Sequence, residues 1–366
     1  MCACIGYLSA AGAVAYSRSH GKTLSILAAA TGAVLVPLFV LVSKGLAQSE
    51  VEVVERAGLL TLAHGTPYLS TPLNVDDVTP YLPGMALFGF PRAVLGETGE
   101  HFQFLGDARL WFAAAFFSCL WLAWRVLGSS ASGLAGITVV ASPVVAMPLA
   151  VSGIDLPIIG LLCLAIALAD RRHPAAAGIA LALACSMKWT AWPAVVIVAV
   201  LLANSAGSRA AARSVWVAVG GTALVILPSA LLSPRPLVEQ VFGFTTGRSE
   251  WVTPAASPLP GRLLADLGPA GWYAATGLLA AGGIAMGISL IVRPPYGLVA
   301  TADRLAIGLS TAFLLAPAGR FGYFALPIFL VIWARLMRWA PAPPTSADVA
   351  PSSSERTISA SVGVDR

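Results

Sequence analysis

The chain has 366 residues, of which 57% are hydrophobic and only 11% are charged. Roughly a quarter of the residues of a soluble domain are charged, so this composition excludes a soluble protein and indicates an all-α polytopic membrane protein. The formal net charge is +5. Because its cations concentrate on alternate loops, this charge predicts membrane orientation rather than nucleic-acid binding.

Ten or eleven transmembrane helices are expected, depending on whether the short apolar segment over residues 5–16 is counted. A firm span over residues 24–46 is followed by a polar, acid-rich interval. The remaining spans are predicted at 109–127, 133–151, 155–169, 175–187, 190–203, 214–232, 269–292, 304–317 and 321–337. Several fall short of the about 20 residues that a span requires, which predicts helix breaks near Pro143, Pro148, Pro157, Pro193 and Pro317.

Positive charges recur on every second connection between these segments. By the positive-inside rule this set of connections is cytoplasmic, and the protein is expected in the cell membrane. Residues 1–340 are predicted to form one integral membrane domain, and the Pro- and Ser-rich residues 341–366 a disordered cytoplasmic tail. The cytoplasmic set carries Arg18, Lys22, Arg125, Arg171, Arg172, Arg209, Arg213, Arg293, Arg304, Arg335 and Arg338.

The interval over residues 47–108 forms the large first extracytoplasmic loop in this orientation and holds nearly half of the chain's carboxylates. Residues 49–64 have the pattern of an amphipathic interfacial helix that ends at Gly65. Glu52 and Arg56 are spaced as a surface ion pair on that helix. The apolar run Met85 to Phe90 is too short to span and is expected to form a second surface helix.

Two acidic residues at the edges of this loop each have two readings. Glu50 lies where a span ends, so its carboxylate is either a partly desolvated general base or a charge that complements the helix dipole. Asp107 either caps the next span or faces a cavity.

Four cations occupy outward turns that are far apart in the sequence: Lys188, Arg248, Arg262 and Arg320. If they converge, they would suit a phosphate or pyrophosphate group, although Lys188 between Trp189 and Trp192 is also a normal interfacial lysine. Tyr68 and Tyr81 follow prolines in turns, where interfacial anchoring alone would explain them. The five cysteines are scattered, and neither a metal site nor another cofactor is expected.

Seven stretches carry a resemblance to a known family. They are EVEVVERAGLLTLAHGTPYL, PYLPGMALFGFPR, GDARLWF, SGIDLPIIGL, MKWTAWP, TPAASPLPGRLLA and APAGRFGYFALP. Together they resemble an actinobacterial branch of glycosyltransferase family 87 over about residues 20–338. That family has the GT-C fold and comprises mannosyltransferases that use polyprenyl-phosphate-mannose.

The resemblance implies an inverting hexosyltransferase, with mannose as the expected sugar. Its partners would be a polyprenyl-phosphate sugar donor, a lipid or glycan acceptor with an extracytoplasmic hydroxyl, and membrane lipids. The family's catalytic carboxylate follows a span, which places it at Glu50, with Glu52 as the alternative. Lys188, Arg320, Arg262 and Arg248 would bind the donor phosphate, and the substrate pocket would be lined by Tyr68, Tyr81, Asp107, Asp155, Trp189, Trp192 and Tyr323.

The chain departs from the family pattern at three places. Glu50 stands where the family usually has Asp, Gly319 stands where Thr is expected, and residues 243–251 lack a Pro-Leu-Gly pattern. A catalytically inactive envelope scaffold is therefore one alternative. A polytopic transporter or lipid flippase is another, although mid-membrane ionisable residues and pseudo-symmetric halves, which it would require, are not evident.

Overall fold

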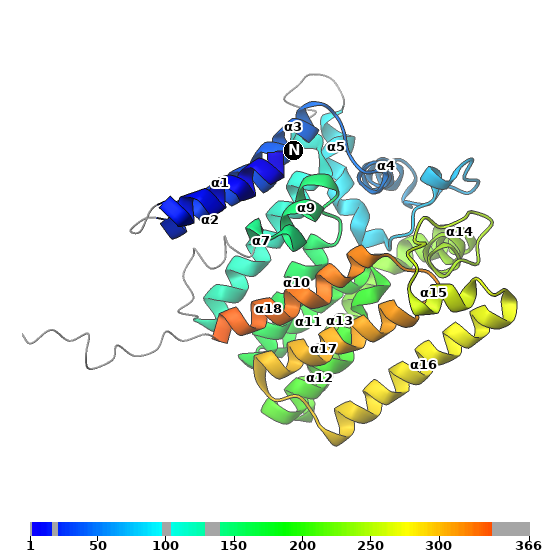
Figure 1. Ribbon diagram of the computed structural model, residues 1–366. Helices are drawn as coiled ribbons and strands as arrows, with labels where there is room; N and C mark the ends of the chain where they lie inside the picture. The colour runs from blue at the N-terminus through cyan, green and yellow to red at the C-terminus, as the bar shows by residue number, and fades with distance from the viewer. Residues whose placement is uncertain (1, 17–20, 97–103, 129–139, 339–366) are drawn as a thin grey trace, which may run out of the picture.

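The computed structural model describes residues 2–16, 21–96, 104–128 and 140–338. Within these ranges the regular secondary structure is helical, apart from an isolated parallel bridge between Ala256 and Gly319. Seven of the described helical segments are long and apolar enough to cross a membrane (Figure 1). The chain is therefore an all-α polytopic membrane protein.

The seven segments account for most of the predicted spans. Three more apolar helices and α9 coincide with the others but are shorter. The prediction for residues 133–139 and for the tail 341–366 lies outside the described residues. The seven long segments are Gly21–Ser43 (α2 Gly21–Ala30, a π-helical turn and α3 Val36–Ser43), α7 (Ala108–Leu127), Trp189–Ala206 with α12 (Pro193–Ala206), α13 (Ser208–Leu232), α16 (Pro269–Val292), α17 (Gly297–Leu315) and Phe321–Arg338 with α18 (Ala325–Arg338). The four shorter helices are α1 (Cys2–Tyr16), α9 (Pro143–Val151), α10 (Leu156–Asp170) and α11 (Pro174–Met187).

Prolines determine many of these helix boundaries. Pro143, Pro157 and Pro193 each lie in the first turn of a helix, where the missing N–H costs no hydrogen bond. α17 ends at Leu315, shortly before Pro317. The predicted breaks at these four prolines are confirmed. The predicted break at Pro148 is wrong, because this residue lies inside α9.

α10 forms the centre of the bundle. Most of its side chains, including Leu162 and Ile166, are buried, and it packs against α7, α11, α12, α17 and α18. α13 and α16 expose large apolar side chains such as Leu224 and Ile284. α16 lies at the edge of the bundle (Figure 1). A helix buried on all sides belongs to a protein core, whereas these exposed apolar faces suit contact with lipid.

The acid-rich interval contains the predicted helix α4 (Ser49–His64), which ends at Gly65 in the left-handed conformation. It is followed by the short 3-10 helices Val75–Asp77 and Pro83–Gly89 and by α5 (Phe90–Leu95). The prediction of a second surface helix near Met85 is wrong, because this residue is buried against other elements. α4 packs closely on this segment where Gly58 meets Gly89, since neither glycine has a side chain to separate the two backbones.

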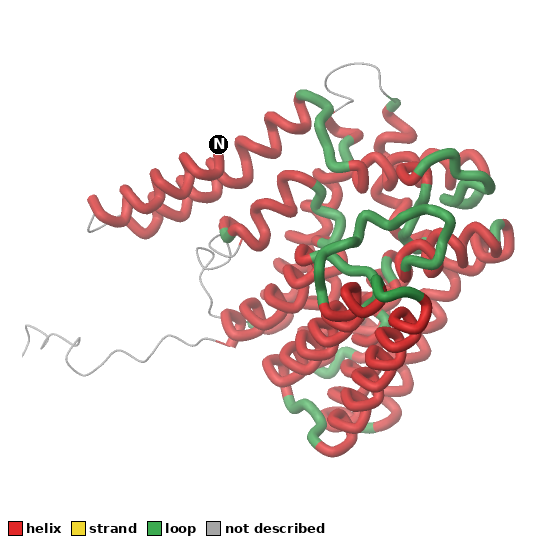
Figure 2. The backbone as a smooth tube through the Cα atoms, turned by 45° about the vertical axis from the view of Figure 1, so that its right-hand side comes forward, coloured by secondary structure: helices red, strands yellow, loops and turns green. Residues whose placement is uncertain are grey.

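The two ends of the bundle differ in character. At one end Arg338 pairs with Asp170 at 2.8 Å, which joins the ends of α18 and α10. The longer loops lie at the other side of the helices (Figure 2). Asp155 precedes the first turn of α10, and Arg320 precedes the 3-10 turn Phe321–Phe324 that leads into α18, so both lie at the helix ends opposite to that ion pair.

Candidate functional site

Four charged side chains from separate helix ends meet at the loop-rich end of the bundle. Glu50 lies in the first turn of α4, Asp155 is the residue before α10, Lys188 follows α11, and Arg320 precedes the 3-10 turn Phe321–Phe324. Each lies at or next to the end of a helical segment, so none lies in the middle of an apolar helix. These four residues are called the charged cluster below.

The longest-range contact in the cluster joins Glu50 and Arg320, which are 270 positions apart in the sequence. Arg320 Nη1 donates to Glu50 Oε1 at 2.6 Å, and Ser152 Oγ donates to the second carboxylate oxygen at 3.1 Å. The side chains of Glu50 and Arg320 are 22% and 26% exposed. The carboxylate is thus oriented at both oxygens while remaining reachable from outside.

Lys188 forms the second ion pair of the cluster. Its Nζ donates to Asp155 Oδ1 at 2.6 Å and lies 5.6 Å and 5.4 Å from the ring centres of Tyr81 and Tyr323. Burial alone lowers the pKa of Lys188, but the carboxylate of Asp155 and the nearby Glu50 outweigh it, so the pKa is raised. The ammonium therefore remains charged between two aromatic faces.

Tyr81 lies beside the Lys188–Asp155 ion pair. Burial raises the pKa of its hydroxyl well above the ordinary value, and the negative charges of Glu50 and Asp155 raise it further, against the smaller effect of Arg320. Tyr81 therefore stays protonated. The geometric link between Tyr81 and the cluster is its ring, whose centre lies 5.6 Å from Lys188 Nζ.

Backbone hydrogen bonds hold each part of the cluster in place. Gln48 N donates to Val151 O, which joins the start of α4 to the end of α9. Leu82 N donates to Met187 O at 3.0 Å and so places Tyr81 beside Lys188. These contacts are made by main-chain atoms, so the sequence pattern around them gives little sign of the pairing.

The loop that precedes α15 (Pro260–Ala265) fixes Arg320 from the other side. Gly319 N donates to Ala255 O, Ser257 N donates to Gly319 O, and Arg320 Nε donates to Pro254 O. A Cβ at Gly319 would lie 3.0 Å from Leu259 Cδ1. The glycine that departs from the expected Thr therefore fits the close packing of this loop.

The structure separates the two carboxylates that the sequence left as alternatives. Glu52 is exposed, and within the described residues it forms no hydrogen bond or ion pair. The predicted Glu52–Arg56 ion pair is wrong, since Arg56 lies 3.8 Å from Asp77 instead. Glu50 is the carboxylate that contacts Arg320 of the charged cluster.

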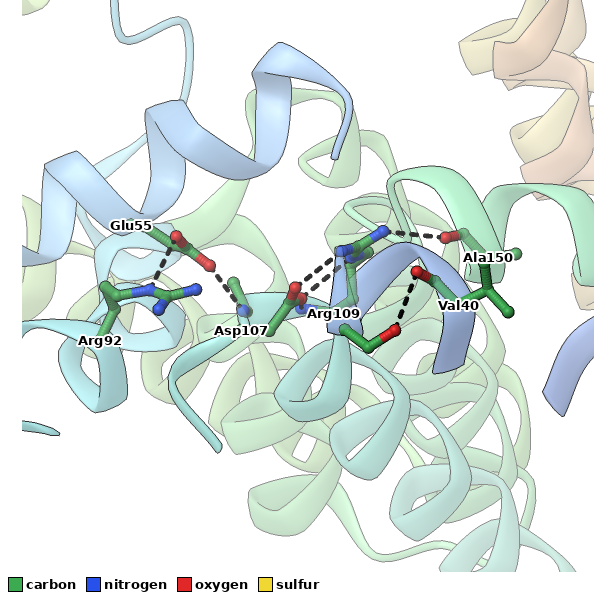
Figure 3. Close-up of polar contacts among 8 residues, drawn as sticks. Val40, Glu55, Arg92, Asp107, Arg109 and Ala150 are labelled. Carbon is green, nitrogen blue, oxygen red and sulfur yellow. Dashed lines mark hydrogen bonds and ion pairs between the residues drawn. The ribbon is translucent and has the colours of Figure 1, made fainter. Parts of the chain in front are cut away.

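Asp107 has a structural role in this arrangement. Its Oδ1 accepts from Arg109 N at the start of α7, which confirms the predicted cap, and its carboxylate holds the buried Arg109 guanidinium through Nε and Nη2. Arg109 Nη1 also donates to Ala150 O at 3.1 Å (Figure 3). With its carboxylate occupied in this way, Asp107 contacts none of the charged cluster within the described residues.

Glu55 joins α4 to the start of α7. Glu55 accepts from Arg92 Nε at 3.1 Å and from Ala108 N at 3.0 Å (Figure 3). Burial raises the pKa of Glu55, against the hydrogen bond from Ala108 and the charge of Arg92. The sequence analysis missed both this pair and the contact of Ser152 with Glu50; only the nearness of Ser152 to Asp155 in the chain could have indicated the latter.

The predicted aromatic residues divide between two places. Tyr81 and Tyr323 flank Lys188, as described above. Tyr68 is buried, and its hydroxyl donates a hydrogen bond to Tyr81 O at 2.9 Å. Tyr68 therefore helps to fix the backbone of Tyr81. Trp189 and Trp192 pack against Phe242, and Trp192 Nε1 donates to Cys185 O.

Two of the predicted phosphate-binding cations are bound elsewhere. Arg262 on α15 pairs at 2.8 Å with Asp266, the residue that follows this helix. Arg248 stacks on Trp272, with its guanidinium carbon 3.9 Å from the ring centre. Within the described residues neither contacts the charged cluster, so their role at the donor phosphate stays a prediction.

Within the described ranges, no group of three or more His, Cys, Asp or Glu side chains is arranged to hold a metal ion. Comparisons of the chain with models of known protein families, with curated proteins and with solved structures found no match. The chemistry of the site is accordingly inferred from the residues of the cluster. They supply two carboxylates and two cations on partly exposed side chains.

Proposed function

We propose that this protein is an integral membrane glycosyltransferase that moves a hexose, with mannose as the first candidate, from a polyprenyl phosphate donor to an acceptor hydroxyl. The observation that carries the proposal is the contact of Glu50 with Arg320, with Lys188 beside them. Such a transfer requires a base for the acceptor hydroxyl and positive charge for the departing phosphate. Both are present in the cluster.

In the proposed reaction, the acceptor oxygen forms a bond to the anomeric carbon as the bond from that carbon to the phosphate oxygen breaks. The acceptor proton passes to the carboxylate of Glu50, and the bonding electron pair leaves with the polyprenyl phosphate. Attack opposite the phosphate inverts the anomeric centre. Arg320 and Lys188 stabilise the negative charge on the leaving group, which suits hydrogen-bonding cations.

A donor phosphate would compete with Glu50 for Arg320. Within the described residues Arg320 Nη1 and Nε have hydrogen-bond partners and Nη2 has none, so Nη2 is free to meet the phosphate first. A shift of the guanidinium toward the phosphate would then release Glu50 to accept a proton. The ion pair would thereby keep the base occupied until a donor is bound.

The proposed site faces the outside of the cell. The charged cluster lies at the end opposite to Arg335 and Arg338, which belong to the set of cations that the positive-inside rule assigns to the cytoplasm. A site at the ends of spans is at the depth of lipid phosphates, so a lipid-linked sugar can reach it with its tail still in the membrane. A GT-C-type fold is part of this proposal.

Incubation of the purified full-length protein with polyprenyl phosphate carrying a radiolabelled hexose and a membrane lipid extract tests the proposal. We expect a labelled glycoside together with release of unlabelled polyprenyl phosphate. A nucleotide sugar in place of the lipid donor should give no product. Uptake of a labelled solute by proteoliposomes without any new glycosidic bond would instead indicate a transporter.

A further inference from the structure

A second basic site lies apart from the charged cluster. An open pocket of about 610 Å³ is lined by Pro234, Arg235, Val238, Glu239, Gly243 and Arg248. It lies beside the short helix α14 (Pro234–Leu237) and the π-helical turn Val238–Gly243. The hydroxyls of Ser233 and Thr66 join this region to the C-terminal end of α4, whereas Glu50 lies in the first turn of that helix.

Arg248 is held in this pocket by aromatic rings. Its guanidinium carbon lies 3.9 Å from the ring centre of Trp272 and 4.9 Å from that of Tyr273. Trp272 Nε1 donates to Thr246 O at 2.9 Å, and Arg248 N donates to Gly243 O at 2.7 Å. A guanidinium stacked on aromatic faces keeps its in-plane N–H groups available to a ligand. Arg248 is therefore positioned without being neutralised.

Neither arginine of the pocket has an acidic partner within the described residues. Arg262, Arg320 and Arg338 each form an ion pair with a carboxylate, whereas Arg235 and Arg248 form none. Glu239 supplies the pocket's one carboxylate and is exposed. The lining thus carries one net positive charge. A singly charged phosphodiester matches this charge better than a doubly charged phosphomonoester.

The pocket lies where two candidate spans end. α13 ends at Leu232, directly before the pocket, and Tyr273 lies in the first turns of α16. Leu232, Val238 and Tyr273 are 63%, 58% and 60% exposed, so apolar surface adjoins the two arginines. The ends of spans lie at the level of lipid headgroups, where a phosphate adjoins hydrocarbon. A free inorganic anion would gain no binding energy from the apolar part of this surface, whereas a lipid would.

We propose that this pocket binds the phosphodiester headgroup of an anionic membrane phospholipid. Arg235 and Arg248 donate hydrogen bonds to the phosphate oxygens, and Val238 contacts the hydrocarbon below the headgroup. Glu239 disfavours a second negative charge. This binding site is separate from the charged cluster and does not depend on the proposed sugar transfer.

Binding of fluorescent phosphatidylglycerol to the full-length protein in detergent micelles tests the proposal. The double variant Arg235→Gln/Arg248→Gln should bind about tenfold more weakly than the parent, because both phosphate donors are removed. The matched control is Arg209→Gln/Arg213→Gln, which removes two exposed arginines from the opposite end of α13 and should bind as the parent does. The single variant Arg235→Gln leaves the Trp272 stack intact and should still weaken binding several-fold.

Three results would overturn the proposal. Parent-like binding by both Arg235→Gln and the double variant would exclude the two arginines. An equal loss in the Arg209/Arg213 control would indicate a nonspecific charge effect. Displacement of the labelled lipid by inorganic phosphate, or equally tight binding of phosphatidylcholine, would exclude a site selective for an anionic phospholipid.

Discussion

At the scale of residues, the charged cluster is electrically balanced. Two carboxylates face two cations, and each cation is bound by one carboxylate at 2.6 Å. No charge of this group is left unpaired in the absence of a ligand. An anionic ligand must therefore replace a carboxylate at one of the cations, and Arg320 has the free N–H groups to begin this exchange.

Lys188→Met tests the role of the second cation. The variant keeps a long side chain but leaves Asp155 unpaired, so a negative charge faces the donor phosphate in place of a positive one. The KM for the polyprenyl phosphate sugar should rise by about tenfold or more. Lys188→Arg retains the charge and serves as the control. Initial rates against donor concentration measure the effect, and an unchanged KM in Lys188→Met would remove Lys188 from the phosphate site.

Asp107 and Arg109 form a pair whose importance is to stability. The Arg109 side chain is fully buried and the Asp107 side chain is 6% exposed, so loss of one partner strands a buried charge. Arg109→Met should lower the free energy of unfolding by about 3–5 kcal/mol. Asp107→Asn/Arg109→Met should recover part of this loss, since Asn still caps α7. Unfolding in mixed detergent micelles measures both, and a single variant as stable as the parent would contradict the account.

At the scale of elements, the packing of α4 on the 3-10 helix Pro83–Gly89 depends on two glycines. A Cβ on Gly89 would overlap the backbone of Val54, and one on Gly58 would overlap Gly89. Gly89→Ala should destabilise the protein by about 1–3 kcal/mol, because packed backbones cannot separate without disturbing the core. Gly283→Ala on α16 is the control, since an added Cβ there meets nothing within 4 Å. Equal thermal stability of the two variants would contradict this packing.

The helices were largely predictable because apolar runs and prolines mark their extent. Glu50, Asp155, Lys188 and Arg320 were predictable as candidates for a related reason: each lies near the end of a predicted apolar segment. Which of them pair could not be predicted, because the pairing depends on how the helices pack. The positions of Arg248 and Arg262 outside the charged cluster could not be predicted, because the long polar stretch between α13 and α16 has no hydrophobic periodicity that indicates where its cations lie.

At the scale of the whole molecule, the account requires the two ends of the bundle to face opposite sides of the membrane. Cys2 and Cys4 are exposed, whereas Cys119, Cys163 and Cys185 are buried, so a Cys2→Ser/Cys4→Ser background suits labelling. In intact cells a membrane-impermeant maleimide should label Glu52→Cys and leave Arg209→Cys unlabelled until the cells are permeabilised. The reverse pattern would place the charged cluster in the cytoplasm and contradict the proposed orientation.

The most direct test of the account compares Glu50→Gln with Glu52→Gln in the sugar-transfer assay. Both changes neutralise a carboxylate in the first turn of α4, but only Glu50 contacts Arg320. Glu50→Gln should lower kcat by about a hundredfold or more, because the acceptor hydroxyl loses its base, whereas Glu52→Gln should stay close to the parent. Parent-like transfer by Glu50→Gln, or an equal loss in both variants, would contradict the assignment of Glu50 as the base.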